Sequence, residues 1–389
     1  MTNGAVRGMF REAIEHMAPY SPGEQPRAGQ RLIKLNTNEN PYPPSPRVRA
    51  AIVKAAATSL RLYPPPRADE LVKAAARLYR ISREMILAGN GSDELLAMLF
   101  RAVLARGDKV AFALPTYSLY DTLAAIQEAR VAAVPLGPGF AQPLAALAAE
   151  RAELTIVCNP NSPCGSLAAP AQLADLARML DGRLLAIDEA YVDFAASNAL
   201  ALVKRHPNVV VLRTLSKSFS LAGMRVGLCF AQSPVIEQLL KVKDSYNLSR
   251  VAVGAGAAAL SDVGWMQRNV ERIKRVRALA EKRLRRMGFE VPPSHANFVL
   301  ARIAGHDMGA VAAGLRRRGI LVRHFPHSVF RDSLRISIGT QGEMETLFKT
   351  LQPLIKPMVI GSAHRGDPQG NAMAFEAPAR GPKTNDEPA

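Results

Sequence analysis

Short apolar runs alternate with helical patterns along most of the chain. From about residue 46 to residue 260, the apolar runs have the length of buried strands, and segments with helical periodicity, such as 93–104 and 171–180, lie between them. Strands that alternate with helices predict a largely parallel sheet with helices on both faces. The expected strands are 85–88, 109–114, 130–135, 154–158, 184–187, 209–212 and 226–230. The sequence therefore predicts an α/β fold whose large domain, residues 46–260, contains a mostly parallel seven-stranded sheet.

Three further parts flank this predicted domain. Residues 1–45 lack sustained periodicity and are rich in proline, asparagine and glycine, which predicts an irregular N-terminal arm that packs on the small domain. Residues 261–357 predict a smaller α/β domain. Its expected strands are 297–301, 320–322 and 334–338, and its expected helices are 265–287, 308–318 and 342–354. Residues 358–389 are rich in glycine, proline and polar residues and are expected to be a disordered tail.

The composition is that of an ordinary soluble protein. Of the 389 residues, 48% are hydrophobic and 21% are charged, which suits a two-domain globular protein. The N-terminus lacks an apolar signal region, and the longest apolar stretch, residues 251–260, is too short to span a bilayer. The three cysteines are too few and too scattered for a disulfide framework, and no cluster has the spacing of a zinc site. We expect a cytoplasmic protein without a metal.

The net charge of +17 raises the question of an anionic partner. Much of it lies in the segment 265–287, an expected amphipathic helix with its apolar face at Val270, Ile273, Val276, Ala280 and Leu284. Basic helices mostly present a solvated face. A basic surface can also attract nucleic acid, but the absence of interleaved aromatic residues weakens that interpretation. A nucleic-acid-binding protein without catalysis is therefore the remaining alternative from another functional class, and we expect no nucleic-acid partner.

A lysine follows one of the expected strands directly. Lys217 is flanked by Ser216 and Ser218, and Arg225 follows behind a tight turn. A lone lysine at the end of a strand is usually solvated, but a lysine with a lowered pKa can form a Schiff base with an aldehyde cofactor. Hydroxyl groups and a guanidinium group suit the phosphate of such a cofactor.

Other chemically useful residues also follow expected strands. Asp188 ends a buried strand, where a fixed carboxylate keeps the ring nitrogen of a pyridoxal-type cofactor protonated, and we expect Glu189 to point to the other side of the chain. Tyr191 is a candidate donor to the phenolic oxygen of that cofactor. After a Gly-Asn-Gly turn, Ser92 and Asp93 are expected to cap a helix whose first N–H groups favour an anion.

These segments, in this order, resemble the fold-type-I aminotransferases that use pyridoxal 5′-phosphate (PLP), most closely the histidinol-phosphate aminotransferase family. The resemblance covers about residues 20–340. The matching motifs are LNTNENPY (35–42), YP (63–64), GNGSDEL (89–95), PTY (115–117), NPNSPCG (159–165), DEAYVDF (188–194), RTLSKSFSLAGMRVG (213–227), ANFVL (296–300), LVRHF (321–325) and LRISIGT (334–340).

The resemblance implies a role for each matching residue. Lys217 would bind PLP covalently and then act as acid and base, Asp188 would pair with the pyridine nitrogen, and Tyr191 would contact the phenolic oxygen. Tyr117, which can stack on an aromatic ring, would cover the cofactor. The residues implied to hold the phosphate are Ser92, Asp93, Ser216, Arg225 and, from the neighbouring subunit of a homodimer, Tyr63.

The substrate residues follow from the same resemblance. Arg335 would bind the carboxylate of the amino-acid or 2-oxoacid partner, and Arg323 and Tyr20 would hold the phosphate of the substrate, with Asn38 also in the substrate site. In one departure, Ser162 stands where the family usually has asparagine, and Cys164 where it has threonine. A serine hydroxyl can still donate, so we expect a weaker contact to the phenolic oxygen, aided by Asn161.

The implied reaction is the transfer of an amino group between histidinol phosphate and 2-oxoglutarate, in two half-reactions with ping-pong kinetics. Two alternatives keep the cofactor and differ in the substrate or the reaction. One is an aromatic (phenylalanine) aminotransferase, because family members differ mainly in the side-chain pocket. The other is a threonine-phosphate decarboxylase.

Overall fold

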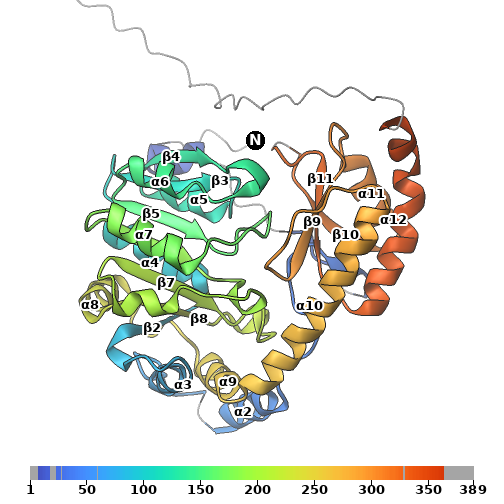
Figure 1. The fold of residues 1–389 in the computed structure, drawn as a ribbon. Coiled ribbons are helices and arrows are strands. Elements are labelled where there is room, and N and C mark those ends of the chain that lie inside the picture. The colour runs from blue at the N-terminus through green and yellow to red at the C-terminus, as the bar shows by residue number, and fades with distance from the viewer. Residues whose placement is uncertain (1–7, 18–22, 28, 59, 327–328, 363–389) are drawn as a thin grey trace, which may run out of the picture.

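A seven-stranded sheet organises most of the chain in the computed structural model, which describes residues 8–17, 23–27, 29–58, 60–326 and 329–362 (Figure 1). Its strands are β2 (Ile86–Gly89), β3 (Lys109–Leu114), β4 (Arg130–Pro135), β5 (Leu154–Cys158), β6 (Leu184–Asp188), β7 (Val209–Thr214) and β8 (Gly227–Phe230). They lie in the order β2-β8-β7-β6-β5-β3-β4, and β8 runs in the opposite direction to the other six strands. The predicted α/β fold with a mostly parallel seven-stranded sheet is confirmed.

Successive residues of the central strands face two separate hydrophobic cores. In β7, Val209 and Val211 belong to one core, and Val210 and Leu212 belong to the other. Because side chains alternate along a strand, both faces of the sheet must be covered. Helices α2 (Pro46–Thr58), α3 (Asp69–Tyr79), α6 (Leu144–Ala149), α7 (Pro170–Met179) and α9 (Arg250–Leu260) contribute to the first core. Helices α4 (Ser92–Val103), α5 (Leu119–Ile126) and α8 (Ser233–Val242) contribute to the second.

A second sheet of four strands lies beside the first. Its strands are β1 (Ile33–Leu35), β9 (Phe298–Arg302), β10 (Ile320–His324) and β11 (Ser333–Ser337), in the order β1-β10-β11-β9. The prediction of a wholly irregular arm is wrong at β1, which pairs in parallel with β10. A three-residue strand leaves no periodicity in the sequence, because its hydrogen bonds go to residues almost 300 positions away, as from Ile33 N–H to the Gly319 carbonyl (2.9 Å).

Helices α10 (Val263–Arg286), α11 (Gly309–Arg317) and α12 (Gln341–Ser362) pack around this second sheet (Figure 1). All five residues of the predicted apolar face of α10 are buried, and most of its basic residues are exposed.

The predicted end of the last helix is wrong, because α12 continues through Pro357 into the first residues of the expected tail. A proline is costly in a helix interior but need not end the helix, and the buried apolar stripe of Leu347, Leu351 and Ile355 fixes the turns that precede Pro357. Within the described residues, no helix is long and apolar enough to cross a membrane. The rest of the expected tail, 363–389, lies outside them.

The remaining helical elements are the five-residue helix α1 (Glu12–His16) and five short 3₁₀ segments. The 3₁₀ segments are Arg83–Met85, Pro138–Phe140, Val192–Phe194, Leu200–Lys204 and Ala222–Met224. The side chain of Arg11, which precedes α1, donates to the Ile126 carbonyl (2.9 Å) and pairs with Glu128, so the arm is attached to the end of α5.

The start of α4 is built around glycine. Ser92 and Asp93 were expected to cap this helix, but α4 begins at Ser92, and the cap position belongs to Gly91, without a side-chain hydrogen bond. Gly91 has a φ of 83°, a value that favours glycine over residues with a side chain. The first residue of β8, Gly227, lies directly against this turn, because a Cβ atom there would be 2.4 Å from the Gly91 carbonyl carbon and 2.6 Å from Ser92 N.

Replacing Gly227 by alanine should therefore disturb the turn before α4. Because the clash is with backbone atoms, which cannot rotate away, we expect Gly227→Ala to lower the free energy of unfolding by about 2–3 kcal/mol in urea titrations. Gly223→Ala is the matched control, because nothing lies within 4 Å of the added methyl group. Equal effects of the two substitutions would contradict this account of the turn.

Candidate active site

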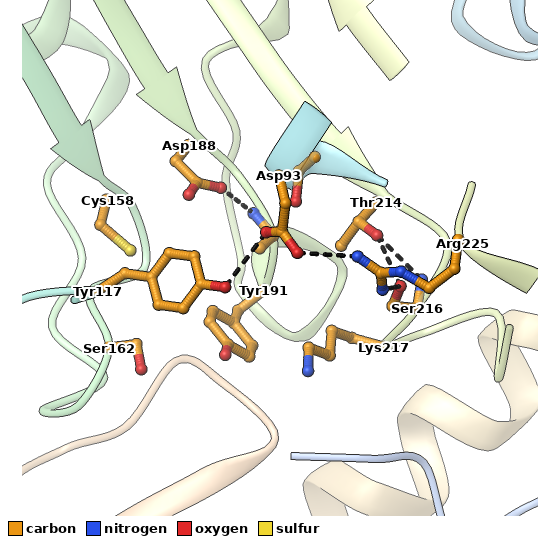
Figure 2. Close-up of a pocket in the computed structure, with 12 residues that line it drawn as sticks. Asp93, Tyr117, Cys158, Ser162, Asp188, Tyr191, Thr214, Ser216, Lys217 and Arg225 are labelled. Atoms are coloured by element: carbon orange, nitrogen blue, oxygen red, sulfur yellow. Dashed lines mark hydrogen bonds and ion pairs between the residues drawn. The ribbon is translucent and has the colours of Figure 1, made fainter. Parts of the chain in front are cut away.

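The carboxyl ends of three neighbouring strands meet at one cavity (Figure 2). Cys158 ends β5, Asp188 ends β6, and Thr214 ends β7, and the parallel register places these ends side by side. Ligands of open α/β sheets bind at this edge. The cavity has a volume of about 160 Å³. It is lined by Ser92, Asp93, Tyr117, Cys158, Ser162, Asp188, Ala190, Tyr191, Thr214, Ser216, Lys217 and Arg225. Nine of the eleven residues assigned from the sequence to catalysis or to the cofactor, Lys217 among them, therefore line one cavity.

A second cavity, of about 340 Å³, adjoins the first and shares Tyr117, Ser162, Tyr191 and Lys217 with it. Its other side comes from the four-stranded sheet. Arg323 on β10 and Arg335 on β11 are cross-strand partners in the register of this sheet, and both line the cavity. Asn38 also lines it. Two guanidinium groups therefore face a space that opens towards the Lys217 amine.

The Lys217 amine is held in a site that disfavours its charge. Its Nζ donates to the Thr37 carbonyl (3.1 Å) and lies 5.8 Å from the centre of the Tyr191 ring. Burial, and then the positive charge of Arg335, lower the pKa of Lys217 to about 8, against the opposing effects of Glu39 and Asp93. A large fraction of this amine is neutral, and so nucleophilic, at mildly alkaline pH.

The buried Asp188 carboxylate accepts two hydrogen bonds. The Tyr120 hydroxyl donates to its Oδ2 (2.7 Å), and the backbone N–H of Ala190 donates to its Oδ1 (3.1 Å). Burial raises the pKa of Asp188 to about 6, although both donors lower it. Glu189 faces away from the cavity, as predicted, and pairs with Arg213 (2.7 Å). Tyr120 was missed in the sequence, because nothing local to it indicates a partner at the end of β6.

Hydroxyl and guanidinium groups gather where α4 begins. The Arg225 guanidinium donates to Asp93 Oδ2 (2.8 Å) and to Ser216 Oγ (3.5 Å), and Thr214 Oγ1 donates to the same Ser216 oxygen (2.9 Å). The other oxygen of Asp93 accepts from the Tyr117 hydroxyl (3.2 Å), so the Asp93 carboxylate connects Tyr117 and Arg225 (Figure 2). The N-terminus of α4 adds free backbone donors and the positive end of the helix dipole. This corner of the cavity suits an anion.

The departure from the usual asparagine places Ser162 against Arg335. The Arg335 guanidinium donates to Ser162 Oγ (3.1 Å) and to the Asn36 carbonyl (2.9 Å). Burial raises the pKa of Tyr191, whereas the charge of Arg335 and hydrogen bonding from Asn38 and Ser162 lower it, so the Ser162 hydroxyl also interacts with Tyr191. The Tyr191 hydroxyl accepts a hydrogen bond from Asn38 Nδ2 (3.0 Å).

Two of the predicted residues that the structure describes, Tyr63 and Asn161, do not line these cavities. Tyr63 is 77% exposed and stacks on Tyr246, with ring centres 4.5 Å apart. Asn161 is buried and holds its own loop together by accepting from the Cys164 thiol (3.0 Å) and donating to the Pro115 carbonyl (3.4 Å). Tyr20 lies outside the described residues.

Known proteins match nearly the whole chain. The model of the aminotransferase class I and II family matches residues 30–351. The histidinol-phosphate aminotransferase of Citrifermentans bemidjiense is 46% identical over 89% of this chain and 98% of its own length. A crystal structure of the Sinorhizobium meliloti histidinol-phosphate aminotransferase in complex with pyridoxal-5′-phosphate covers 90% of this chain and 98% of its own, at 28% identity and a TM-score of 0.83. The L-threonine-O-3-phosphate decarboxylase of Porphyromonas gingivalis, at 20% identity and a TM-score of 0.74, shares the fold and covers 84% of this chain and all of its own.

The fold and these matches define a fold-type-I, PLP-dependent aminotransferase. The chain belongs to the aminotransferase class I and II family and, within it, to the histidinol-phosphate aminotransferases.

The lowered pKa of Lys217 predicts its reactivity in the cofactor-free protein. We expect the rate of acylation of Lys217, followed by mass spectrometry, to rise with a midpoint near pH 8. Arg335→Met removes a positive charge that disfavours the charged amine, so the midpoint should move to higher pH. Arg323→Met removes an arginine that lines the same cavity but is not among the main charges that shift the pKa of Lys217, so this variant should leave the midpoint in place. Equal shifts of the acylation midpoint in the two variants would contradict the effect assigned to Arg335.

Tyr120→Phe should raise the pKa of Asp188 beyond about 6, because the variant loses a donor to the charged form. The folded protein then keeps this proton to a higher pH than the unfolded chain, which releases it near the ordinary value of 3.8. The contribution of Asp188 to the free energy of unfolding therefore falls as pH rises through this window, and in the variant the fall should extend further up. Urea titrations of the cofactor-free protein between pH 4 and pH 8 measure this pH dependence of the free energy of unfolding. Tyr117→Phe, whose hydroxyl contacts Asp93 instead, should follow the wild type.

Proposed function

We propose that this enzyme transfers an amino group between histidinol phosphate and 2-oxoglutarate, with PLP bound in the cavity that contains Lys217. The observation that carries the proposal is the pair of arginines, Arg323 and Arg335, that face the adjoining cavity from neighbouring strands. Two anionic substrates, one with a phosphate and one with carboxylates, need fixed cations at this position. The names of the relatives at 40–46% identity support the same substrate.

The cavity residues fit PLP group by group. The Lys217 amine would meet the aldehyde, Asp188 would pair with the ring nitrogen, and Tyr117 would stack on the ring. Ser92, Ser216 and Arg225 would hold the phosphate at the start of α4, where a Cβ atom on Gly91 would come within 2.5 Å of the Arg225 guanidinium and close the space. Asp93 would act by positioning Tyr117 and Arg225, because its carboxylate contacts both.

PLP, when bound, supplies an aldehyde carbon and an electron-accepting ring. Lys217 is placed to hold a proton at Nζ and to return it to the substrate, because its pKa of about 8 allows both protonation states near neutral pH. Asp188 would keep the ring nitrogen charged. Ser162 and Tyr191, which both line the cavity, would contact the phenolic oxygen. Arg335 would bind the carboxylate of glutamate or 2-oxoglutarate, and Arg323, with Tyr20, the phosphate of histidinol phosphate.

We also propose that the enzyme is a homodimer. Tyr63 lies outside the cavity of its own chain, in an exposed apolar group with Leu60, Leu62 and Tyr246. Covering this group with a second subunit would remove apolar surface from water and bring Tyr63 towards the phosphate site of the partner. The cytoplasmic location stays a prediction from the sequence.

The aromatic aminotransferase remains the second candidate, because Tyr117, Phe325 and Phe330 line the substrate cavity and suit a phenyl ring. Turnover with 2-oxoglutarate should be measured for histidinol phosphate, phenylalanine and threonine phosphate, with carbon dioxide release assayed for the last. We expect histidinol phosphate to have the highest kcat/KM. A preference for phenylalanine, or release of carbon dioxide from threonine phosphate, would overturn the proposal.

Arg323→Met tests the assignment of the phosphate site. Losing a charged hydrogen-bond donor should lower kcat/KM for histidinol phosphate roughly 10- to 100-fold. The half-reaction with glutamate, which carries no phosphate, should change much less. Equal losses in both half-reactions would contradict the assignment.

A further inference from the structure

An acidic side chain lies in the cavity that is otherwise supplied with cations. Asp121 sits in the first turn of α5, four residues after Tyr117, and lines the substrate cavity together with Tyr117, Phe325 and Phe330. The two candidate anion-binding residues of the same cavity, Arg323 and Arg335, come from the other sheet. A carboxylate here does not help to bind a phosphate or a carboxylate, so its presence needs another explanation.

Asp121 has no hydrogen-bond or ion-pair partner among the residues that the structure describes. The surrounding protein raises the pKa of its carboxyl group by desolvation alone. An acidic residue in the first turn stabilises a helix modestly, but this effect does not require the side chain to line a cavity. The side chain is exposed to the cavity, so water solvates the carboxylate in the free enzyme, and a bound ligand that displaces this water must supply a hydrogen bond in its place.

We infer that Asp121 is a specificity-determining residue that accepts a hydrogen bond from the imidazole N–H of the substrate; this rests on the proposed function. An imidazole ring offers an N–H donor, and in its protonated form a positive charge as well. The aromatic side chains beside Asp121 suit the faces of the ring. A phenyl ring of similar size has no donor, so it would displace water from the carboxylate without replacing the lost hydrogen bond. Sites built to hydrogen-bond a substrate group discriminate strongly against an analogue that lacks it.

The test uses the PLP-loaded enzyme and two amino substrates that share amine and phosphate but differ in the ring. These are histidinol phosphate and phenylalaninol phosphate. In the wild type we expect kcat/KM to favour histidinol phosphate, and Asp121→Ala should reduce this preference at least about 10-fold. Asp121→Asn, whose amide oxygen can still accept, should give a smaller reduction. The half-reaction with glutamate should be unaffected, because glutamate has no ring.

Asp175→Asn is the control, since it makes the same change at an exposed side chain on α7. If the wild type uses histidinol phosphate but Asp121→Ala keeps the full preference, the inference is overturned and the proposed function stands. If Asp121→Ala slows the glutamate half-reaction equally, Asp121 serves the structure of the cavity, and the inference is again overturned. If the wild type does not use histidinol phosphate, the proposed function itself fails.

Discussion

The structure depends on keeping an amine and a carboxylate away from water at the edge of one sheet. Burial lowers the pKa of Lys217 to about 8 and raises that of Asp188 to about 6, so both groups are shifted towards neutrality. Each group is also fixed by hydrogen bonds, Lys217 to the Thr37 carbonyl and Asp188 from Tyr120 and Ala190. The two hydrophobic cores on either side of the strands provide the rigid support that this arrangement requires.

The substrate side of the site exists only because two sheets meet. The seven-stranded sheet supplies Lys217 and Asp188, whereas Arg323 and Arg335 come from the four-stranded sheet more than 100 residues later. The N-terminal arm completes the boundary, since Asn38 contacts Tyr191 and the Asn36 carbonyl accepts from Arg335. A cavity assembled from three parts of the chain can hold anionic groups next to the amine and still vary in the residues that face the substrate ring.

The serine in the Asn-Pro-Asn-Ser loop illustrates how one substitution changes a network. Ser162 accepts from Arg335 and also interacts with the Tyr191 hydroxyl, and this one short side chain lines both the first and the second cavity. Asn161, its neighbour, turns into the loop and bonds Cys164. The sequence suggested that both residues would face the cofactor. Adjacent positions in an irregular loop have no fixed periodicity, so the packing of the loop decided their directions.

The sequence by itself determined the succession of strands and helices along the chain and the residues near the strand ends, including Lys217, Asp188 and Arg225. Apolar periodicity and short motifs are local, and parallel strands bring their carboxyl ends to one edge whatever the details. Only the tertiary structure decided the contact of Tyr120 with Asp188, the pairing of Asp93 with Arg225, the strand β1 and the presence of Asp121 in the substrate cavity. These features join residues that are distant in sequence, and their geometry follows from packing between elements.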